Sequence, residues 1–401
     1  MSPAERSPLR VMLSAGEASG DLHGASLCRA LQAQAPGVRL FGLGGPRMAG
    51  VGMEQLADIR EIAVIGFSEA LRRFPAIQRT YRRLVAALVN ERPDVVVLID
   101  FPGLNLRLAG AAHRAGLPVV YFIPPQIWAW APGRIRTIQR RVSLVLAVLP
   151  FERALYQRAG IPVEFVGHPI LDTLADLPDR STARRELGLD EQALVIGLLP
   201  GSRPQEIRHM MPLMREAAGR VASVHPRARF VVGLAPTVER TDVEPYLSGG
   251  PAITVVADRT HAVMRAADLL LVTSGTATLE AALLGTPMLV CYRVSILTEW
   301  LGAPMVRVPW ISLTNLVLGR AVVPEFYWRR DAKPERIAGA ALRLLASPEA
   351  LDAQRRAFAE LADELGQPGV AARAAQTVLS IAEGDRLPSR PREARARTAA
   401  S

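Results

Sequence analysis

The sequence is poor in the residues that build disulfide-linked or metal-bound folds. Its 401 residues include two cysteines, Cys28 and Cys291, and six histidines. None of these side chains has a partner at metal-ligand spacing, so the pattern favours buried free thiols and predicts no metal site. Long apolar runs are also missing, and no stretch approaches the roughly 20 residues needed to cross a bilayer.

Two further absences bear on location and partners. The opening segment, "MSPAERSPLR", lacks the apolar core of a signal peptide, which predicts a cytoplasmic protein. Lysine is nearly absent, with Lys333 alone, so arginine carries the net charge of +10. This charge favours anionic partners such as phosphorylated small molecules or an anionic membrane surface. Zinc-finger, RNA-recognition and helix-turn-helix signatures are missing, which argues against nucleic acid.

Short β-branched runs alternate with amphipathic helical segments in both halves of the chain, as in parallel sheets covered by helices. The runs that predict strands are "RVMLSAG", "VRLFGLGG", "DVVVLID", "PVVYFI", "LVLAVLP", "VEFVG", "LVIGLLPGSR", "ARFVVGLA", "ITVVAD", "DLLLVTSG" and "PMLVCYR". We therefore expect an α/β fold of two Rossmann-like domains facing a cleft, over residues 1–168 and 169–360. A helix over 361–384 is expected to cross back to the first domain, and 385–401 to form a disordered basic tail.

The second half carries two strand-to-helix turns suited to phosphate. In "LLPGSRPQEI", Gly201 lets the backbone approach a ligand, and Arg203 offers a planar fork for phosphate oxygens. The alternative is a plain turn with a solvated arginine.

The other turn, "VTSGTATLEAAL", places Ser274, Gly275 and Thr276 between a strand and a helix, where hydroxyl groups and the helix dipole suit a diphosphate. Glu280 lies about one turn into that helix, where its carboxylate can accept hydrogen bonds from ribose hydroxyls. The alternative is helix capping, with Glu280 in a capping box. Together the two turns favour a nucleotide site at the carboxyl ends of the strands.

The first half offers a carboxylate and two tryptophans after buried strands. Asp100, in "VVVLIDFPGLN", is placed to be a general base, and equally to be a helix N-cap or a structural acceptor. Trp128 and Trp130 lie in the proline-rich segment "PPQIWAWAPGR". There they can stack on a sugar, line an acyl chain or pack under the loop.

The turn "SAGEASGD" after the first strand resembles a phosphate loop at first sight. Its glycines, Gly16 and Gly20, have G-x-x-x-G spacing, so the dinucleotide fingerprint is absent. Glu17 and Asp21 would repel a diphosphate, and their carboxylates suit a neutral ligand rich in hydroxyls. For Asp21 the alternative is a cap of its own helix.

The segment "REIAVIGFSEALRRFP" combines apolar residues with arginines. Such a stretch can lie in a membrane interface or accept a lipid, and the alternative is a core helix with charged ends. The candidate membrane contacts are Ile65, Phe67, Leu71, Arg72, Arg73 and Phe74.

Over residues 10–380 the ordered motifs resemble the lipid-A-disaccharide synthase family, which joins two acylated glucosamines in Gram-negative lipid A assembly. The motifs are "SAGEASGDLHGA", "PQIWAWAPGRI", "VLAVLPFE", "FVGHP", "LLPGSRPQEI", "SGTATLEAAL" and "ISLTNLVLGR". The resemblance implies an inverting glycosyltransferase of GT-B architecture that needs no metal ion or other cofactor. It also implies a peripheral enzyme at the cytoplasmic side of the inner membrane, and a homodimer is compatible with it.

The resemblance further implies a reaction between UDP-2,3-diacylglucosamine and 2,3-diacylglucosamine 1-phosphate, giving a β-1,6 disaccharide 1-phosphate and UDP. Asp100 would take the proton of the acceptor's 6-hydroxyl. UDP would be held by Gly201, Ser202, Arg203, Ser274, Gly275, Thr276, Glu280 and Asn315. The sugar side would comprise Gly16, Glu17, Ser19, Gly20, Asp21, Trp128 and Trp130.

Two alternatives remain open at this point. A UDP-N-acetylglucosamine 2-epimerase-like enzyme would share the nucleotide pocket but form its product without an acceptor. A non-catalytic nucleotide-sugar binding protein would tolerate replacement of Asp100.

Overall fold

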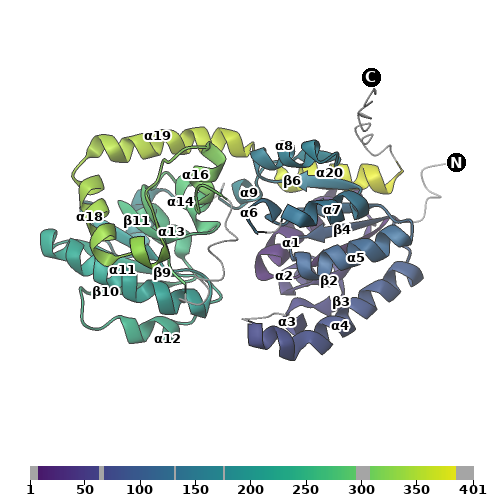
Figure 1. Cartoon of the computed structure of the whole chain (residues 1–401), viewed down its shortest axis with the longest axis horizontal. Coiled ribbons are helices and arrows are strands. Elements are labelled where there is room, and N and C mark those ends of the chain that lie inside the picture. Colours follow the sequence, from purple (N-terminus) through teal and green to yellow (C-terminus); the bar gives the residue numbers. More distant parts are fainter. Residues whose placement is uncertain (1–7, 63–66, 131, 175–176, 295–307, 385–401) are drawn as a thin grey trace, which may run out of the picture. The chain divides into compact units, whose positions relative to one another are not determined.

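The computed structural model describes residues 8–62, 67–130, 132–174, 177–294 and 308–384 (Figure 1). The chain divides into two compact units. The first comprises Met1–Asp172 together with Leu365–Ser401, and the second comprises Thr173–Glu364. Each unit is built on one parallel sheet with helices packed against it, so the expected fold class of two Rossmann-like α/β domains is confirmed.

The sheet of the first unit has seven strands in the order β3-β2-β1-β4-β5-β6-β7, all parallel. The strands are β1 (Arg10–Ala15), β2 (Arg39–Gly44), β3 (Glu54–Asp58), β4 (Val95–Ile99), β5 (Val119–Phe122), β6 (Leu144–Ala147) and β7 (Val163–Phe165). The strand order reverses between β1 and β4, and Ala15 pairs with Ile99 there. The turns after these two strands therefore begin side by side, at the point where open α/β sheets bind ligands.

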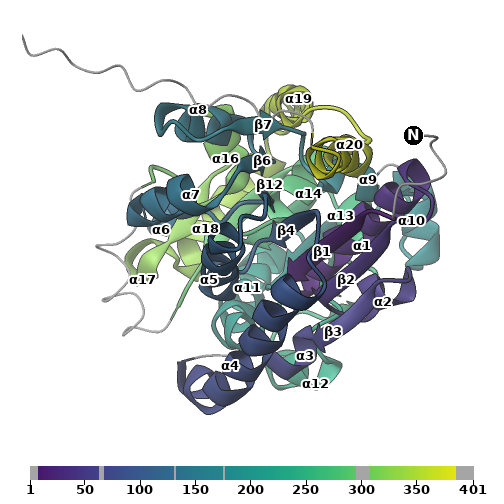
Figure 2. The ribbon, with the colours of Figure 1, turned by 90° about the vertical axis from the view of Figure 1, so that its right-hand side faces the viewer.

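Helices cover both faces of this sheet, which is why its central strands are apolar on both sides. Figure 2 shows α4, α5 and α7 on one face and α1 and α20 on the other. The helices of the unit are α1 (Ala18–Gln34), α2 (Pro46–Gly50), α3 (Ile59–Ile62), α4 (Phe67–Asn90), α5 (Pro102–Arg114), α6 (Ile127–Trp130), η2 (Pro132–Arg134), α7 (Ile135–Arg141), α8 (Pro150–Arg158), α9 (Ile170–Leu174) and α20 (Val370–Ala382). Every residue of β4 is buried in the resulting core.

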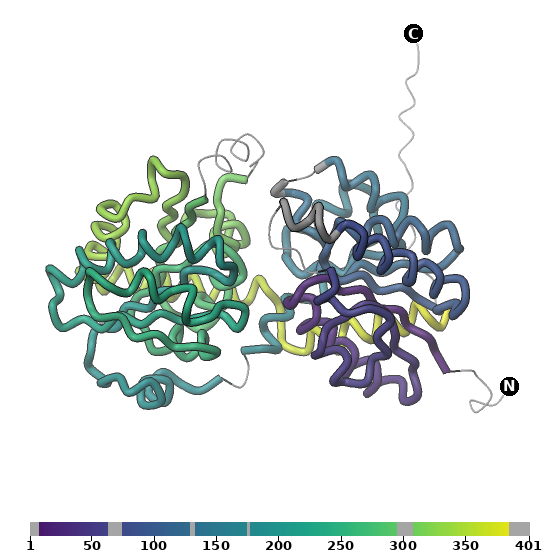
Figure 3. Tube along the Cα trace, turned by 90° about the horizontal axis from the view of Figure 1, so that it is seen from below, coloured from purple at the N-terminus to yellow at the C-terminus, as the bar shows by residue number. Residues whose placement is uncertain are grey.

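The last helix, α20, belongs to the first unit although the second unit precedes it in sequence. Figure 3 shows its yellow tube running among the purple and blue N-terminal elements. The Asp172 carboxylate caps α20 by accepting hydrogen bonds from the amides of Gly369 at 2.6 Å and Ala371 at 3.1 Å. Arg373 donates to the Val166 carbonyl at 2.9 Å. These bonds attach the end of the described chain to the first sheet.

The sheet of the second unit has six strands in the order β10-β9-β8-β11-β12-β13, again all parallel. The strands are β8 (Val195–Leu199), β9 (Arg229–Leu234), β10 (Ile253–Ala257), β11 (Leu269–Thr273), β12 (Met288–Tyr292) and β13 (Glu325–Tyr327). The helices are α10 (Arg180–Glu186), α11 (Pro204–Val224), α12 (Arg240–Val243), η3 (Glu244–Tyr246), α13 (Thr260–Ala266), α14 (Ala277–Leu283), α16 (Leu313–Leu318), α17 (Trp328–Asp331), α18 (Pro334–Leu345) and α19 (Pro348–Leu365).

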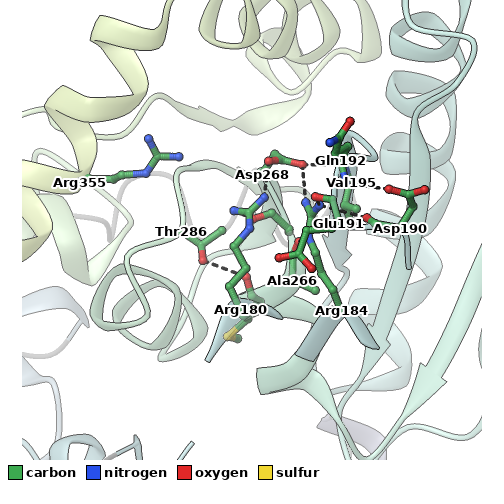
Figure 4. Close-up of polar contacts among 12 residues, drawn as sticks. Arg180, Arg184, Asp190, Glu191, Gln192, Val195, Ala266, Asp268, Thr286 and Arg355 are labelled. Atoms are coloured by element: carbon green, nitrogen blue, oxygen red, sulfur yellow. Dashed lines mark hydrogen bonds and ion pairs between the residues drawn. The ribbon is translucent and has the colours of Figure 1, made fainter. Parts of the chain in front are cut away.

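A buried arginine fastens α10 to the amino-terminal edge of this sheet (Figure 4). The Arg184 side chain is 2% exposed and donates to Asp268 at 2.9 Å and to the Ala266 carbonyl at 3.0 Å. Asp268 also pairs with Arg180 and accepts the amide of Val195 at 2.8 Å. The carboxylate thus neutralises a guanidinium that would be costly to bury alone.

Candidate active site

Asp100 lies in an unusual turn at the carboxyl end of β4. Asp100 and Phe101 have φ angles of 45° and 48°, in the left-handed region that residues other than glycine seldom adopt. The N-cap position of α5 is occupied by Phe101, so the capping alternative for Asp100 is not supported. The half-buried Asp100 carboxylate therefore sits on strained backbone at the mouth of a buried strand.

A fully buried asparagine holds this turn in place. Asn105 Nδ2 lies 2.8 Å from the Asp100 carbonyl and 3.1 Å from that of Ile99, and Asn105 Oδ1 accepts the Ser14 hydroxyl at 2.7 Å. On the other side, the Tyr121 hydroxyl donates to the Asp100 carbonyl at 2.8 Å. Asn105 ends the "IDFPGLN" stretch, but the sequence pattern gives no sign of this role. These bonds keep the backbone of the candidate base rigid.

The turn after β1 lies against the turn after β4. Gly16 is buried, and a Cβ at this position would lie 2.1 Å from the Phe101 ring, so only glycine allows the two turns to meet. Glu17 and Ser19 are exposed at this edge, whereas Gly20 is buried. The structure therefore brings these predicted sugar-side residues to the same edge of the sheet as Asp100.

Asp21 has a different role from the one expected. Its side chain is 2% exposed, and its carboxylate accepts the amides of Gly45 at 2.7 Å, Arg47 at 3.0 Å and Met48 at 3.0 Å. These are the N-terminal amides of α2, which Asp21 caps. Because its oxygens are occupied and buried, Asp21 is removed from the predicted sugar-binding set. It caps a neighbouring helix, not its own.

Trp128 is held by Glu152, a residue to which the sequence pattern assigns no role. The indole N–H of Trp128 donates to Glu152 Oε1 at 3.1 Å, and its ring is perpendicular to that of Phe151, with centroids 5.0 Å apart. Glu152 is 1% exposed, and burial raises its pKa to about 7. It lies in the "VLAVLPFE" motif. Trp130 falls in α6, but its side chain lies outside the described part of the structure.

The predicted membrane segment is only partly described. Ile65 lies outside the described residues, as do the side chains of Phe67, Leu71, Arg72 and Arg73, although α4 begins at Phe67. Phe74 is 54% exposed, and so are two valines at other positions, Val89 at 62% and Val224 at 57%. Among the helices that the structure describes, none is long and apolar enough to span a bilayer.

In the second unit, the turn after β8 is built around Glu206, which was not predicted. Glu206 Oε2 accepts the amide of Ser202 at 2.8 Å, and a Cβ on Gly201, whose φ is 116°, would lie 2.3 Å from that oxygen. Arg203 lies 3.4 Å from Glu206 Oε1, and its side chain remains 66% exposed. The turn thus presents an accessible guanidinium at a strand end, as the phosphate interpretation requires.

The neighbouring turn after β11 offers backbone amides in place of the predicted cluster of hydroxyl donors. The Ser274 hydroxyl donates to the Ile311 carbonyl at 2.7 Å, and Thr273 is buried. Gly275, with φ 149°, and Thr276 are exposed, and their amides donate to no other residue that the structure describes. Thr276 makes no side-chain cap, so the capping alternative is not supported.

Glu280 pairs with a histidine and does not complete a capping box. Its Oε2 lies 3.5 Å from His261 Nε2, and the two side chains are 24% and 30% exposed. Both residues belong to helices packed at the same part of the second sheet, α14 and α13. The Glu280 carboxylate remains partly accessible, as contact with a ribose would require.

Asn315 is a structural residue, which corrects its predicted contact with UDP. Its side chain is fully buried: Oδ1 accepts the amides of Val322 and Val323, and Nδ2 donates to the Val323 carbonyl at 2.9 Å and to Glu325 at 2.8 Å. With both acceptor positions and both donors used, nothing remains for a ligand. Glu325 also accepts the amides of Ile311 and Ser312 at 2.8 and 3.0 Å, so the network fixes the segment that binds Ser274.

Within the described ranges, no three histidine, cysteine, aspartate or glutamate side chains gather in a group that could hold a metal ion. Cys28 and Cys291 are buried free thiols, as predicted, and burial raises the pKa of each to about 12. The cysteines are therefore inert at neutral pH.

Comparison with known proteins identifies the family of the chain. The family described as "Lipid-A-disaccharide synthetase" matches residues 11–381. The lipid-A-disaccharide synthase of Trichlorobacter lovleyi is 44% identical over 94% of this chain and 98% of its own length. That of Myxococcus xanthus is 43% identical over 93% of this chain and 98% of its own length.

Solved structures share the fold at low identity. A putative UDP-N-acetylglucosamine 2-epimerase from Listeria monocytogenes superposes with a TM-score of 0.64 at 15% identity, covering 96% of this chain and 99% of its own. The glycotransferase of kitacinnamycin gives 0.60 at 17% identity, covering 96% of this chain and 100% of its own. These likenesses bear on the fold alone, whereas the match to the family spans nearly the whole sequence. The chain therefore belongs to the lipid-A-disaccharide synthetase family of glycosyltransferases.

Proposed function

We propose that the chain transfers a 2,3-diacylglucosaminyl group from UDP to the 6-hydroxyl of 2,3-diacylglucosamine 1-phosphate, with inversion at the anomeric carbon. Membership in the family supports this reaction. The observation that carries this proposal is the backbone geometry at Asp100. Asp100 is the first of two consecutive residues with left-handed φ angles, and Phe101 is the second. A strained backbone persists only where its surroundings hold it, and such sites cluster at reaction centres.

Asp100 is the general base in this proposal. Its carboxylate takes the proton of the 6-hydroxyl while the oxygen attacks the anomeric carbon from the face opposite UDP. The new C–O bond forms as the bond to the β-phosphate oxygen breaks, so UDP leaves with the electron pair and the α-linked donor gives a β-linked product. Asn105 and Tyr121 support the geometry, because a base contributes only when it is within hydrogen-bonding reach of the proton.

The diphosphate of UDP is assigned to the second unit. Arg203 is exposed and suits phosphate oxygens, and the amides of Gly275 and Thr276 are available donors at the adjacent strand end. Gly201 and Ser202 shape the turn that carries Arg203, and Glu280 is assigned to the ribose hydroxyls. Charge on the leaving UDP is then stabilised by these groups, and we expect no requirement for a divalent cation.

Both substrates carry acyl chains, so we propose that the enzyme works at an anionic membrane surface, as a peripheral protein of the inner membrane. Segment 65–74 is the proposed contact, and the exposure of Phe74 supports it. Sedimentation with vesicles containing anionic lipid tests this contact. Replacing Phe67, Leu71 and Phe74 with serine should lower the bound fraction, and unchanged binding would rule the segment out.

The reaction is tested with the purified chain, both substrates, and mass spectrometry of the products. The disaccharide 1-phosphate and UDP should form in equal amounts, also in the presence of EDTA. Incubation with the UDP-sugar alone should give neither product. A 2-epimer formed without the acceptor would instead support the epimerase alternative.

A further inference from the structure

Three neighbouring strands of the first sheet are tied together at their carboxyl ends. The amide of Asp100, after β4, donates to the carbonyl of Ile123, after β5, at 3.1 Å, and the Tyr121 hydroxyl donates to the Asp100 carbonyl at 2.8 Å. The segment that begins at Ile123 continues to Trp128, whose indole N–H donates to Glu152, after β6. The segment from Ile123 to Trp128 is therefore held by a backbone bond to Asp100 at one end and by Glu152 at the other.

The two oxygens of Glu152 have separate tasks. Oε2 accepts the amides of Leu149 at 3.2 Å and Val148 at 3.4 Å, which satisfies donors at the start of α8. Oε1 accepts only the indole N–H of Trp128, at 3.1 Å, among the contacts that the structure describes. Helix capping explains the first oxygen and leaves the second unexplained.

Burying this carboxylate is costly. Glu152 is 1% exposed, and its interactions among the described residues are with Trp128 and two backbone amides, with no arginine, lysine or histidine. A buried carboxylate without a cation destabilises a fold, and an apolar residue of similar size would stabilise it more. The hydrogen bond to Trp128 is a role for the buried carboxyl group that an apolar residue could not serve.

Trp128 is fixed in two directions by this arrangement. The Glu152 oxygen holds the indole nitrogen, and Phe151 meets the ring at an interplanar angle of 87°. A hydrogen bond along the ring plane and a perpendicular ring contact together set the position and the tilt of the indole. A tilted or displaced indole could not present the same surface to a bound sugar.

We propose that Glu152 is a positioning residue for glycosyl transfer, which holds the Trp128 indole, and with it the segment after β5, on the acceptor side of Asp100. The inference rests on the proposed function, and on the sugar-side role of Trp128 that the family resemblance implies. Glu152 acts through Trp128 and touches no substrate.

Two single variants and their combination test this role. Glu152→Gln has one oxygen and one NH2 group, so it cannot accept from Trp128 and from the two amides together. Trp128→Phe keeps an aromatic ring but removes the N–H. Each variant should raise the KM for the acceptor about tenfold, the size expected when a buried hydrogen-bonding group loses its partner, and change kcat much less. The KM for the UDP-sugar should stay unchanged.

The double variant separates positioning from a general structural effect. If Glu152 acts through Trp128, the double variant should have the acceptor KM of Trp128→Phe alone, because the two changes remove the same contact. Glu164→Gln is the matched control: Glu164 is exposed on β7, contacts Thr377 and should leave both KM values unchanged. Additive effects in the double variant would overturn the proposal.

Fluorine NMR supplies a readout that does not need activity. The chain has five tryptophans, so a sample labelled with 5-fluorotryptophan gives a set of resonances from which Trp128→Phe removes that of Trp128. Glu152→Gln should shift this resonance and leave the others in place. An unshifted resonance, or a shifted one with an unchanged acceptor KM, would overturn the proposal. If Glu152→Gln does not fold, the test rests on Trp128→Phe, and an unchanged acceptor KM in that variant would also overturn the proposal.

Failure of the proposed function itself would be recognised separately. In that case the unsubstituted chain forms no disaccharide from the two substrates, whereas the Trp128 resonance still responds to Glu152→Gln.

Discussion

The ring of Phe101 occupies the space that a side chain at position 16 would need: a Cβ on Gly16 would lie 2.1 Å from the ring. This contact joins the turn after β1 to the turn after β4, which carries Asp100. Phe101 itself has a left-handed backbone, so the contact supports a conformation that is costly in isolation.

Gly16→Ala should therefore lower activity more than it lowers stability. The added methyl group pushes Phe101 and the Asp100 turn aside, and a displacement of about 1 Å at a reacting group costs on the order of 100-fold in rate. We expect this loss in kcat, with the chain still folded by circular dichroism. Gly103→Ala is the control, because a Cβ at that position would meet no atom within 4 Å beyond its own helix backbone and chain neighbours. Equal activity of the two variants would contradict the close packing.

Asn315→Ala should unfold more easily than the unsubstituted chain. The substitution leaves the amides of Val322 and Val323 without a buried acceptor, at a cost of about 3 kcal/mol in the free energy of unfolding. Urea denaturation measures this cost. If Asn315 held UDP directly, the variant would keep its stability and lose only affinity for UDP.

The burial of His168 leads us to expect a loss of stability in acid. Burial and the charge of His23 lower its pKa to about 3 in the folded chain, against about 6.5 when unfolded. Between about pH 6.5 and pH 3, His168 is protonated in the unfolded state and neutral in the folded state. The free energy of unfolding therefore falls as the pH drops through this range. The full loss is about 5 kcal/mol on this account.

The variant His168→Asn measures how much His168 contributes to the loss of stability in acid. An asparagine oxygen can replace Nδ1 as the acceptor for the Ile170 amide, which lies 3.2 Å away, and it does not titrate. The variant should therefore lose less stability between pH 7 and pH 5 than the unsubstituted chain, as measured by urea denaturation. Parallel stability profiles would show that His168 is not the group responsible.

Arg180 and Arg184 share the Asp268 carboxylate (Figure 4), and we expect the two arginines to contribute unequally to stability. Asp268→Asn leaves the buried Arg184 without a counter-charge and should cost about 3–5 kcal/mol of unfolding free energy. Arg180 is 42% exposed on the side chain, so Arg180→Ala should cost less than about 1 kcal/mol. Similar losses in the two variants would contradict the difference in burial.

The central strands could be predicted from sequence because they are short, apolar and bounded by turn residues. Strands β3 and β13 were missed: "EQLAD" and "EFY" are edge strands with charged residues, and their place depends on pairing with β2 and β12. Propensity alone does not identify such edges.

The positions of Asp100 and Arg203 near strand ends could be predicted from sequence, because each residue closely follows an apolar run. The role of a residue was predicted wrongly where its polar side chain binds a different segment of the chain. Asp21 caps a helix that begins 25 residues later, and Asn315 holds a loop and a strand beyond its own helix. Glu152 and Asn105 were overlooked because their partners are distant in sequence. Burial of a polar group is a property of the fold, and a local motif does not reveal it.

The most direct test of the account is the activity of Asp100→Asn with both acylated substrates. The amide keeps the size of the side chain but cannot take a proton. We predict a fall in kcat of about 100- to 10,000-fold, the usual contribution of a general base, with unchanged stability and UDP binding. Disaccharide formation at the rate of the unsubstituted chain would contradict the assignment of Asp100 as the base.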